Sequence, residues 1–535
     1  MCPRSDTYAE RMLGQEVNPT ERTRSSRFLV WLPRTAPDWA FWLFTGVVVA
    51  AYLVLIRSQL TYGLEYDESY LLRVAANIAS GNGFVDDGVS FWTSATPFDP
   101  NISTGPVLLL PGAVVWKISS GSLALVRLVP ICFFILFLVA TATLFYRWRG
   151  RWAATAALVG PLLLPILAPD LANQALMPGR FVGEIAATAL LLTAAVFLLS
   201  GRDSTAGVVA GLVVLTKLNF VLSILVLLVV SLITRWVAHR PGLLRTASRY
   251  LLGAAIPIAL FEAYKLLALG FSGYLQQVRL LADFTAQQSV PLSQIPAAAF
   301  DKAVSLMRLT SGPVIAVFLA LVVALVCILL LFPFLTTCRT VPARSTQPAA
   351  PSIVLTIAVT SLFLTGSWVL TSSQVSLRPA IPGVLILTSV LTASLAVAAW
   401  TLWEGGFGRI RPVVALAPVI TISLLMSITA YQGARIARNP TGQDLLRNQE
   451  LAANIINQQV ERLPVDGFWT SPEFSVLTAL PYDTGDRYSP ELLIFTSIRA
   501  LLEVGRPDAT AMADDCGEML YESRDVVVCR PKLSP

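Results

Sequence analysis

Repeated apolar stretches of about 20 residues dominate this 535-residue chain. They begin near residue 39 and recur as far as residue 431. A run of this length is what an α-helix needs to cross the hydrocarbon core of a bilayer. Charged residues make up only 13% of the chain, about half of what a soluble domain carries. A soluble globular enzyme and a disordered chain are therefore excluded, and the pattern predicts a polytopic membrane protein.

The hydropathy predicts about 11 transmembrane helices, and the expected fold class is an all-α polytopic membrane bundle with a small extracytoplasmic α/β C-terminal domain. The predicted spans are 39–56, 123–145, 153–169, 184–199, 205–219, 220–234, 250–269, 312–333, 353–371, 379–402 and 412–431. One alternative stays open in this set. Residues 205–234 could form a single long helix, which would reverse the sidedness of every later segment.

The distribution of arginine predicts the orientation of the chain. With the N-terminus inside, every predicted cytoplasmic loop contains arginine, as the positive-inside rule requires. A single helix over 205–234 would place the four arginines of 235–249 outside, so two spans are favoured. The predicted cytoplasmic loops are 146–152, 200–204, 235–249, 334–351 and 403–411.

Three regions follow from this topology. Residues 1–37 are expected to be a cytoplasmic basic tail, 38–431 the transmembrane region, and 432–535 an extracytoplasmic C-terminal domain. The outer segments are long, with a large first outer loop over 58–122, so chemistry is expected on the outer face. The last region has a helix-like piece near 445–463 and a strand-like piece near 526–529. Within it, Cys516 and Cys529 could pair if the region faces an oxidising compartment, and could equally stay reduced.

The rare residues exclude several classes of function. His239 is the single histidine, so histidine-based metal sites and a Ser-His-Asp triad are excluded. No basic stripe carries interleaved aromatic residues, so nucleic acid is not an expected partner. Membrane lipids are expected partners because of the hydropathy.

The first outer loop contains the sequence Tyr66-Asp67-Glu68, about ten residues after the first span. A carboxylate at the membrane surface can accept a proton from an attacking hydroxyl, and its neighbour can orient a substrate. A structural alternative exists, since acidic residues also stabilise the N-terminus of a helix.

Five short motifs follow one another along residues 40–400. They are Tyr66-Asp67-Glu68-x-Tyr70, Thr104-Gly105-Pro106-Val107-Leu108, Arg127-Leu128-Val129-Pro130, Leu215-Thr216-Lys217 and Arg378-Pro379-x-Ile381-Pro382. In this order they resemble the GT-C superfamily of glycosyltransferases, and most of all its protein O-mannosyltransferase and aminoarabinose-transferase-like branches. The second motif lacks the lysine of the family's Lys-Pro-Pro-Leu block.

The resemblance implies roles for the residues of these motifs. Asp67 would be the general base, and Glu68 would orient the donor sugar or the acceptor. Lys217 and Arg378 would hold a phosphate, and Tyr70 would contribute to substrate binding. The implied reaction is a direct displacement that inverts the anomeric carbon. The superfamily also allows a divalent metal, for which carboxylates are the available ligands here.

Several charges lie inside predicted spans or at their rims, where an ionisable group usually has a partner or a function. Arg180 and Glu184 are four residues apart and could form a rim salt bridge. The resemblance suggests a substrate-facing acid at Glu184, and Arg180 is expected to shape the substrate pocket with it. Lys217 could equally extend its amine to the membrane surface. The three-residue spacing of Glu262 and Lys265 predicts a mutual ion pair.

The chain contains no Asp-x-Asp motif and no Gly-rich phosphate loop, so a nucleotide-sugar donor has no evident site. A polyprenyl-phosphate sugar is the expected donor, with a lipid, glycan or protein hydroxyl as acceptor. The short arginine-rich loops favour a bacterial inner or plasma membrane. Two other functions remain as alternatives: a transporter or flippase of lipid-linked sugars, and a non-catalytic protein of envelope-glycan assembly.

Overall fold

The computed structural model describes most of the helical region and part of the C-terminal region. The predicted tail 1–37, the spans predicted at 312–333 and 412–431, and Arg378 lie outside the described residues. The described residues are 38–60, 62–64, 66–86, 96–100, 104–164, 177–237, 239, 241–288, 290, 294–298, 300–302, 350–371, 380–404, 441–460, 468–469, 492–496, 516–522 and 526–531.

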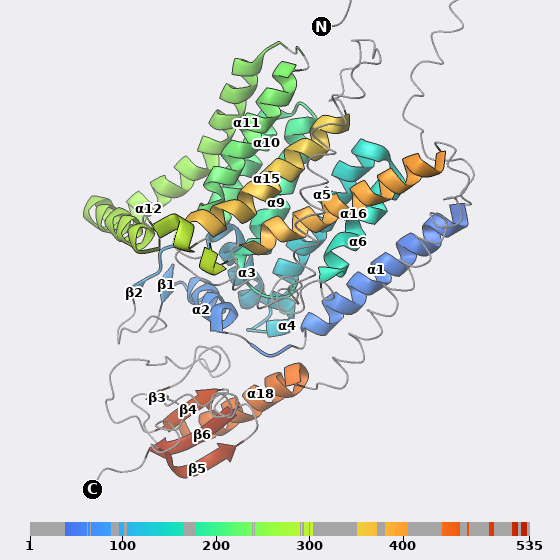
Figure 1. The fold of residues 1–535 in the computed structure, drawn as a ribbon. Helices are drawn as coiled ribbons and strands as arrows, with labels where there is room; N and C mark the ends of the chain where they lie inside the picture. The colour runs from blue at the N-terminus through green and yellow to red at the C-terminus, as the bar shows by residue number, and fades with distance from the viewer. Residues whose placement is uncertain are drawn as a thin grey trace, which may run out of the picture.

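A bundle of apolar helices forms the body of the molecule (Figure 1). Four described stretches are long and apolar enough to cross a membrane: Phe41–Leu60, Leu123–Arg149, Leu218–Val237 and Leu243–Ala286. Shorter apolar helices pack among them, so the predicted membrane bundle is supported, and its count of about 11 spans stays a prediction. The bundle helices are α1 (Asp38–Leu60), α5 (Leu128–Arg149), α6 (Arg151–Leu162), α9 (Gly183–Leu199), α10 (Asp203–Thr216), α11 (Val221–Val237), α12 (Leu243–Gln288), α15 (Ala350–Thr371) and α16 (Ile381–Glu404).

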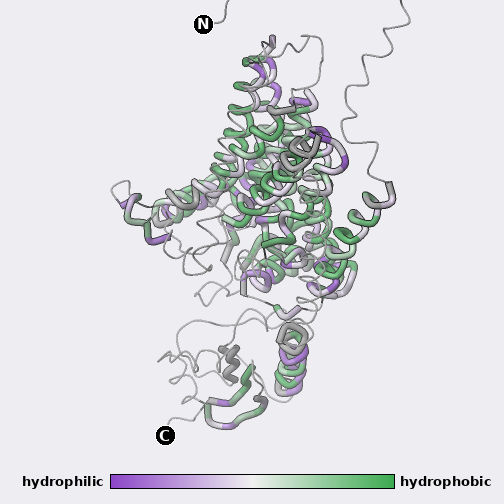
Figure 2. Tube along the Cα trace, turned by 45° about the vertical axis from the view of Figure 1, so that its right-hand side comes forward, coloured by the Kyte–Doolittle hydropathy of each residue, from purple (hydrophilic) through white to green (hydrophobic). Residues whose placement is uncertain are grey.

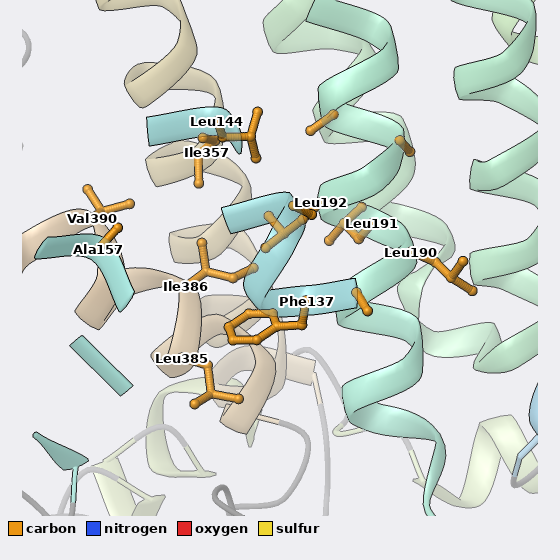
Figure 3. Close-up of a cluster of buried hydrophobic side chains, with 14 of the residues drawn as sticks. Phe137, Leu144, Ala157, Leu190, Leu191, Leu192, Ile357, Leu385, Ile386 and Val390 are labelled. Carbon is orange, nitrogen blue, oxygen red and sulfur yellow. The ribbon is translucent and has the colours of Figure 1, made fainter. Parts of the chain in front are cut away.

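The centre of the bundle is a continuous apolar core. Figure 2 shows hydrophobic residues along the length of the helices and hydrophilic ones mainly at their ends. In Figure 3, Phe137 of α5 lies among side chains that α9, α15 and α16 contribute, including Leu191, Ile357 and Ile386. Many apolar side chains remain exposed on the outside of the bundle, which a lipid environment explains.

The helix pair α10 and α12 is closely packed. A Cβ atom built on Gly207 of α10 would lie 2.0 Å from the backbone oxygen of Tyr250 in α12, so only glycine permits this approach. Small residues at such crossings are typical of membrane helices, because they let backbones come close and increase van der Waals contact.

Residues 205–234 form two helices and not one. Helix α10 ends at Thr216, Lys217 has an extended backbone, and a short 3₁₀ turn over Leu218–Phe220 leads into α11. The prediction of two segments here is therefore confirmed.

Three of the predicted cytoplasmic loops meet at one end of the bundle. Arg147 donates hydrogen bonds to the Val196 carbonyl and to Ser200. Arg235 pairs with Asp203 at 2.9 Å and also donates to the Leu198 carbonyl at 2.7 Å. The loops 146–152, 200–204 and 235–249 thus share one face, as the arginine pattern predicts, and the assignment of this face to the cytoplasm stays a prediction.

The segment predicted to be the first outer loop covers the opposite end, called here the α2–α3 end (Figure 1). It contains α2 (Tyr66–Ala79), strands β1 (Val85–Asp86) and β2 (Thr96–Pro97), α3 (Pro106–Ile118) and α4 (Leu123–Val126). The two strands form a short antiparallel pair. A second apolar cluster joins this loop to the bundle through buried residues of α2, α3 and α9, among them Leu72, Leu108 and Ala186.

Helix α12 contains the ion pair predicted between Glu262 and Lys265, and the structure confirms it at 2.7 Å. Gly270 has a φ of 67° and kinks the helix. Beyond the kink, Tyr274 turns back and donates a hydrogen bond to Glu262 at 3.0 Å. The two charges are therefore satisfied within α12 itself.

The C-terminal region forms a helix and a four-stranded sheet, as the predicted α/β domain requires. Helix α18 (Thr441–Val460) packs against the sheet, whose strand order is β3-β4-β6-β5. The first pair is parallel and the other two pairs are antiparallel. The strands are β3 (Phe468–Trp469), β4 (Leu492–Thr496), β5 (Cys516–Glu522) and β6 (Val526–Pro531).

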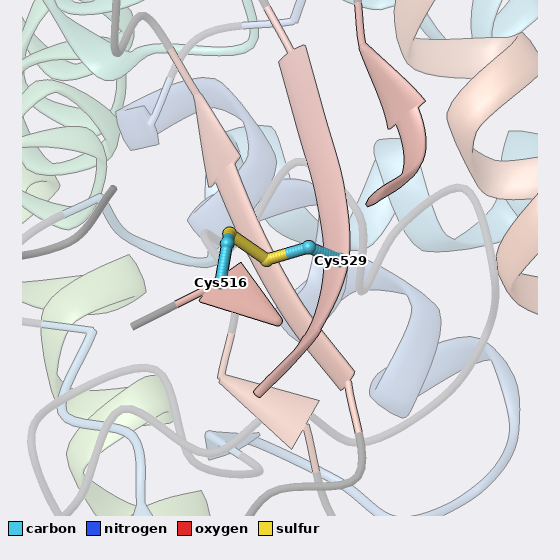
Figure 4. The surroundings of a disulfide bond; sticks show 2 residues. All are labelled: Cys516 and Cys529. Carbon is cyan, nitrogen blue, oxygen red and sulfur yellow. A yellow bond between two sulfur atoms is a disulfide. The ribbon is translucent and has the colours of Figure 1, made fainter. Parts of the chain in front are cut away.

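A disulfide between Cys516 and Cys529 links β5 to β6 (Figure 4). Because it closes a loop over a sequence separation of 13, replacing both cysteines with serine should lower the stability of this domain by about 3 kcal/mol. Thermal unfolding of the full-length protein measures the change, with Cys132→Ser, an exposed free cysteine in α5, as the control. Equal unfolding temperatures for the double variant and the control would show that the disulfide contributes nothing.

Candidate functional site

The paired acids of the first outer loop stand at the N-terminus of α2 and point in different directions. Asp67 and Glu68 lie in the first turn of the helix. Neighbouring helical residues are rotated by about 100° from each other, so one of an adjacent pair can face outward while the other faces the interior. Asp67 is exposed, whereas Glu68 is 1% exposed. The two carboxylates therefore have different surroundings, and Asp67 is the one accessible to a substrate.

Glu68 forms a buried, two-pronged ion pair with Arg127. The Nε atom of Arg127 donates to Oε1 of Glu68 and its Nη2 atom donates to Oε2, both at 2.8 Å. Both side chains are at most 2% exposed. This is the bidentate geometry for which a guanidinium group is suited. Both carboxylate oxygens of Glu68 thus accept from Arg127 in this structure, and the predicted role of Glu68 in orienting a substrate stays a prediction.

The remaining donors of Arg127 hold the chain that leads into α2. Its Nη1 atom donates to the carbonyl of Tyr62 at 2.6 Å and to that of Gln59 at 3.3 Å. Its Nη2 atom approaches the carbonyl of Gly63 at 3.4 Å. One arginine thus satisfies the backbone at the end of α1 and fixes the start of α2, which carries Asp67.

Lys217 and Glu184 form the second charged pair at the α2–α3 end. Glu184 lies in the first turn of α9, and Lys217 lies between α10 and α11. Their Nζ and Oε1 atoms are 3.0 Å apart, with side-chain exposures of 16% for lysine and 7% for glutamate. The structure therefore pairs Glu184 with Lys217. Arg180 lies half-buried just before α9, and its predicted pairing with Glu184 stays a prediction.

Thr104 and Gly105 adjoin this pair. The N–H of Gly105 donates to the carbonyl of Thr216 at 3.0 Å. A Cβ atom built on Gly183 would lie 3.0 Å from both Thr104 Oγ1 and Lys217 Cγ, so these residues are neighbours. The Thr104 hydroxyl is fully buried, and its oxygen has no hydrogen-bond partner. A buried polar atom of this kind usually has a partner, so a ligand beside Lys217 would satisfy it.

Two helix N-termini converge on the same place. Helix α3 begins at Pro106 and α9 begins at Gly183, and neither has a side-chain cap. Uncapped N-termini present backbone N–H groups and a partial positive charge, both of which favour an anion. Together with the amine of Lys217 and the hydroxyl of Thr104, they make a site suited to a phosphate group.

The predicted site also includes two further residues, Tyr70 and Arg378. Tyr70 lies one turn after Asp67, and its ring is 5.6 Å from that of Phe98, so part of its surface packs against the loop. Arg378 cannot be placed, because it lies outside the described residues. Within the described ranges, no group of three or more His, Cys, Asp or Glu residues could hold a metal ion.

The sequence motifs included Arg127 and Thr104 without indicating their interactions. The signal for Arg127 is its place just before the apolar run of α5, where a buried charge needs a partner. Nothing in the sequence identified Glu68 as that partner, because the two residues are 59 positions apart.

Comparisons with solved structures define the class of fold. The structure of ArnT from Cupriavidus metallidurans bound to undecaprenyl phosphate aligns over 92% of this chain and 98% of that one, with 13% identity and a TM-score of 0.54. Its apo state aligns over 91% and 97%, with 12% identity and a TM-score of 0.53. The apo oligosaccharyltransferase of Archaeoglobus fulgidus aligns over 89% of this chain and 73% of that one, with 12% identity and a TM-score of 0.47.

No family model matches the chain, and no curated protein matches it in sequence. At 12–13% identity, the similarity to ArnT concerns the fold alone. The chain therefore shares the fold of ArnT, in agreement with the fold that its motifs predict. Membership of the GT-C superfamily, and the branch within it, stay predictions.

Proposed function

We propose that this protein is a membrane glycosyltransferase that moves a monosaccharide from a polyprenyl-phosphate donor to a hydroxyl acceptor of the cell envelope. The observation that carries the proposal is the pairing of two features at the α2–α3 end. One is an exposed carboxylate, Asp67, on a rigidly held helix start. The other is the proposed anion site at Lys217. A single apolar cluster packs together α2, which carries Asp67, and α3 and α9, whose N-termini adjoin Lys217.

The proposed reaction uses one step. The acceptor hydroxyl attacks the anomeric carbon while Asp67 removes its proton. The bond from that carbon to the phosphate oxygen breaks, and its electrons leave with polyprenyl phosphate. Attack opposite the leaving group inverts the anomeric configuration. Lys217 stabilises the charge that develops on the phosphate, and preorganised donors of this kind supply much of the catalysis in such reactions.

Glu68 and Arg127 support this reaction indirectly. Their ion pair fixes the start of α2 and so sets the direction of Asp67. Glu184 holds Lys217 in place until a phosphate shares the amine. Arg378 is proposed to hold the phosphate together with Lys217, Arg180 to shape the pocket with Glu184, and Tyr70 to contribute to substrate binding.

The donor class is supported by the fold and by the missing motifs. ArnT, whose fold this chain shares, has been crystallised with undecaprenyl phosphate. A lipid-linked donor also suits a chain with no nucleotide-phosphate motif and a site at one end of a membrane bundle. We assign the α2–α3 end to the extracytoplasmic face of a bacterial plasma membrane, because the arginine-rich loops gather at the opposite end.

Replacing Lys217 with glutamine should weaken donor binding. Loss of the amine removes a charge-assisted contact to phosphate, so we expect the KM for the donor and the Kd for undecaprenyl phosphate to rise about 10-fold or more. Lys117→Gln, at an exposed lysine in the last turn of α3, is the matched control. Equal affinities of the two variants would show that Lys217 is not a phosphate ligand.

One assay separates the proposed function from its alternatives. Purified protein is incubated with radiolabelled polyprenyl-phosphate sugars and a membrane extract that supplies acceptors. Release of free polyprenyl phosphate together with a labelled acceptor supports the transferase. Intact labelled lipid crossing a liposome membrane supports a flippase instead. Binding without either outcome supports a non-catalytic assembly protein.

A further inference from the structure

Gln449 occupies an unexpected position on α18. The buried side of this helix contains Ala452, Ala453 and Ile456, which follow Gln449 at the spacing of one helical face. Gln449 is itself only 2% exposed. The Gln449 amide is thus buried at the N-terminal end of an otherwise apolar helix face. Such an amide requires hydrogen-bond partners, because a buried polar group without them lowers the stability of the fold.

The partner of Gln449 is the backbone of Leu64, in the first outer loop. The N–H of Leu64 donates to Oε1 of Gln449 at 3.0 Å, and Nε2 of Gln449 donates to the Leu64 carbonyl at 3.2 Å. Leu64 is 2% exposed and stands three residues before Asp67. The amide therefore binds both polar backbone groups of one residue, two positions before the start of α2.

The segment from Tyr62 to Leu64 is thus held from two sides. On one side, Arg127 of the membrane bundle donates hydrogen bonds to the carbonyls of Tyr62 and Gly63. Gln449, from the C-terminal domain, binds Leu64. Helix α18 is anchored in turn to the sheet, since it packs against β6 and the hydroxyl of Tyr521 donates to Asn448 at 3.3 Å.

We propose that Gln449 is a positioning residue, through which the C-terminal domain sets the backbone that carries Asp67. The catalytic part of this inference rests on the proposed function, whereas the contact with Leu64 does not. A general base acts only from a narrow range of positions, and a displacement of about 1 Å can cost on the order of 100-fold in rate. The C-terminal domain thereby contributes to catalysis without a contact to either substrate.

The Gln449→Glu variant tests the contact in the full-length protein. At neutral pH the new carboxylate cannot donate to the Leu64 carbonyl and repels it, so hydrogen exchange of the segment 62–72 should become faster than in the wild type. At about pH 5 the buried carboxyl group can take up a proton, which restores the donor. The difference from the wild type at the same pH should then shrink. Gln458→Glu, at an exposed position on the same helix, should change neither value.

The same two variants test the positioning role, with radiolabelled polyprenyl-phosphate sugars as the probe. For Gln449→Glu we expect kcat to fall about 10-fold or more at neutral pH and to recover at about pH 5 relative to the wild type, with the KM for the donor unchanged. Recovery in the same protein preparation shows that the loss at neutral pH does not come from misfolding.

Each result decides one part of the inference. Unchanged exchange over 62–72 in Gln449→Glu overturns the contact. Faster exchange with an unchanged kcat overturns the positioning role and leaves the proposed function standing. A wild-type protein that transfers no sugar from any donor overturns the proposed function and with it the catalytic role of Gln449, while the exchange result still decides whether Gln449 holds Leu64.

Discussion

The Asp67→Asn variant should lose sugar transfer by about 10²–10⁴-fold and keep its fold. The amide has the size of the carboxylate but cannot accept the proton of the attacking hydroxyl. Because Asp67 is exposed at the N-terminus of α2, the change leaves the buried contacts of that helix intact. The measurement is the initial rate of label transfer from a polyprenyl-phosphate sugar, alongside thermal unfolding.

Asp283→Asn is the matched control for this experiment, because Asp283 is an exposed acid on α12, a helix that contributes none of the proposed site residues. It should transfer sugar at the wild-type rate. If Asp67→Asn keeps full activity, Asp67 is not the base. A large drop in the unfolding temperature would instead assign Asp67 a structural role at the start of the helix.

The Arg127→Met variant should be the most destabilising single change at the α2–α3 end. It leaves the carboxylate of Glu68 buried without its partner and frees the carbonyls of Gln59, Tyr62 and Gly63. Removing one member of a buried ion pair typically costs about 3–5 kcal/mol. We expect a clearly lower unfolding temperature in detergent, and loss of transfer activity with it.

A second variant separates two contributions to the loss of stability: the unpaired carboxylate of Glu68 and the missing hydrogen-bond donors of Arg127. Combining Arg127→Met with Glu68→Leu removes the unpaired carboxylate, so the combined variant should be more stable than Arg127→Met alone. It should not reach the wild-type stability, since the backbone carbonyls still lack their donor. If Arg127→Met unfolds at the wild-type temperature, the ion pair does not hold α2 in place.

The sequence predicted those parts of the fold that depend on local pattern. Apolar runs located the bundle helices, and the arginines of 235–249 decided that 205–234 contains two helices. The spacing of Glu262 and Lys265 predicted their ion pair, because both residues belong to one helix. Each of these signals lies within a short stretch of chain.

The site was less predictable, because its pairs join distant helices. Lys217 and Glu184 were both selected as charges at the rim of a span, but their contact depends on how α9 packs against α10. The bond from Gln449 to Leu64 connects positions 385 residues apart. Such contacts follow from helix packing, which periodicity and hydropathy do not specify.

A structure of the protein with bound undecaprenyl phosphate, determined by electron cryo-microscopy, would test the account most directly. We predict density for the phosphate within hydrogen-bond reach of Lys217 Nζ and Thr104 Oγ1, at the N-termini of α3 and α9, with the Asp67 carboxylate facing the space beside it. A phosphate bound elsewhere on the bundle, with Lys217 still paired only to Glu184, would contradict the proposed site.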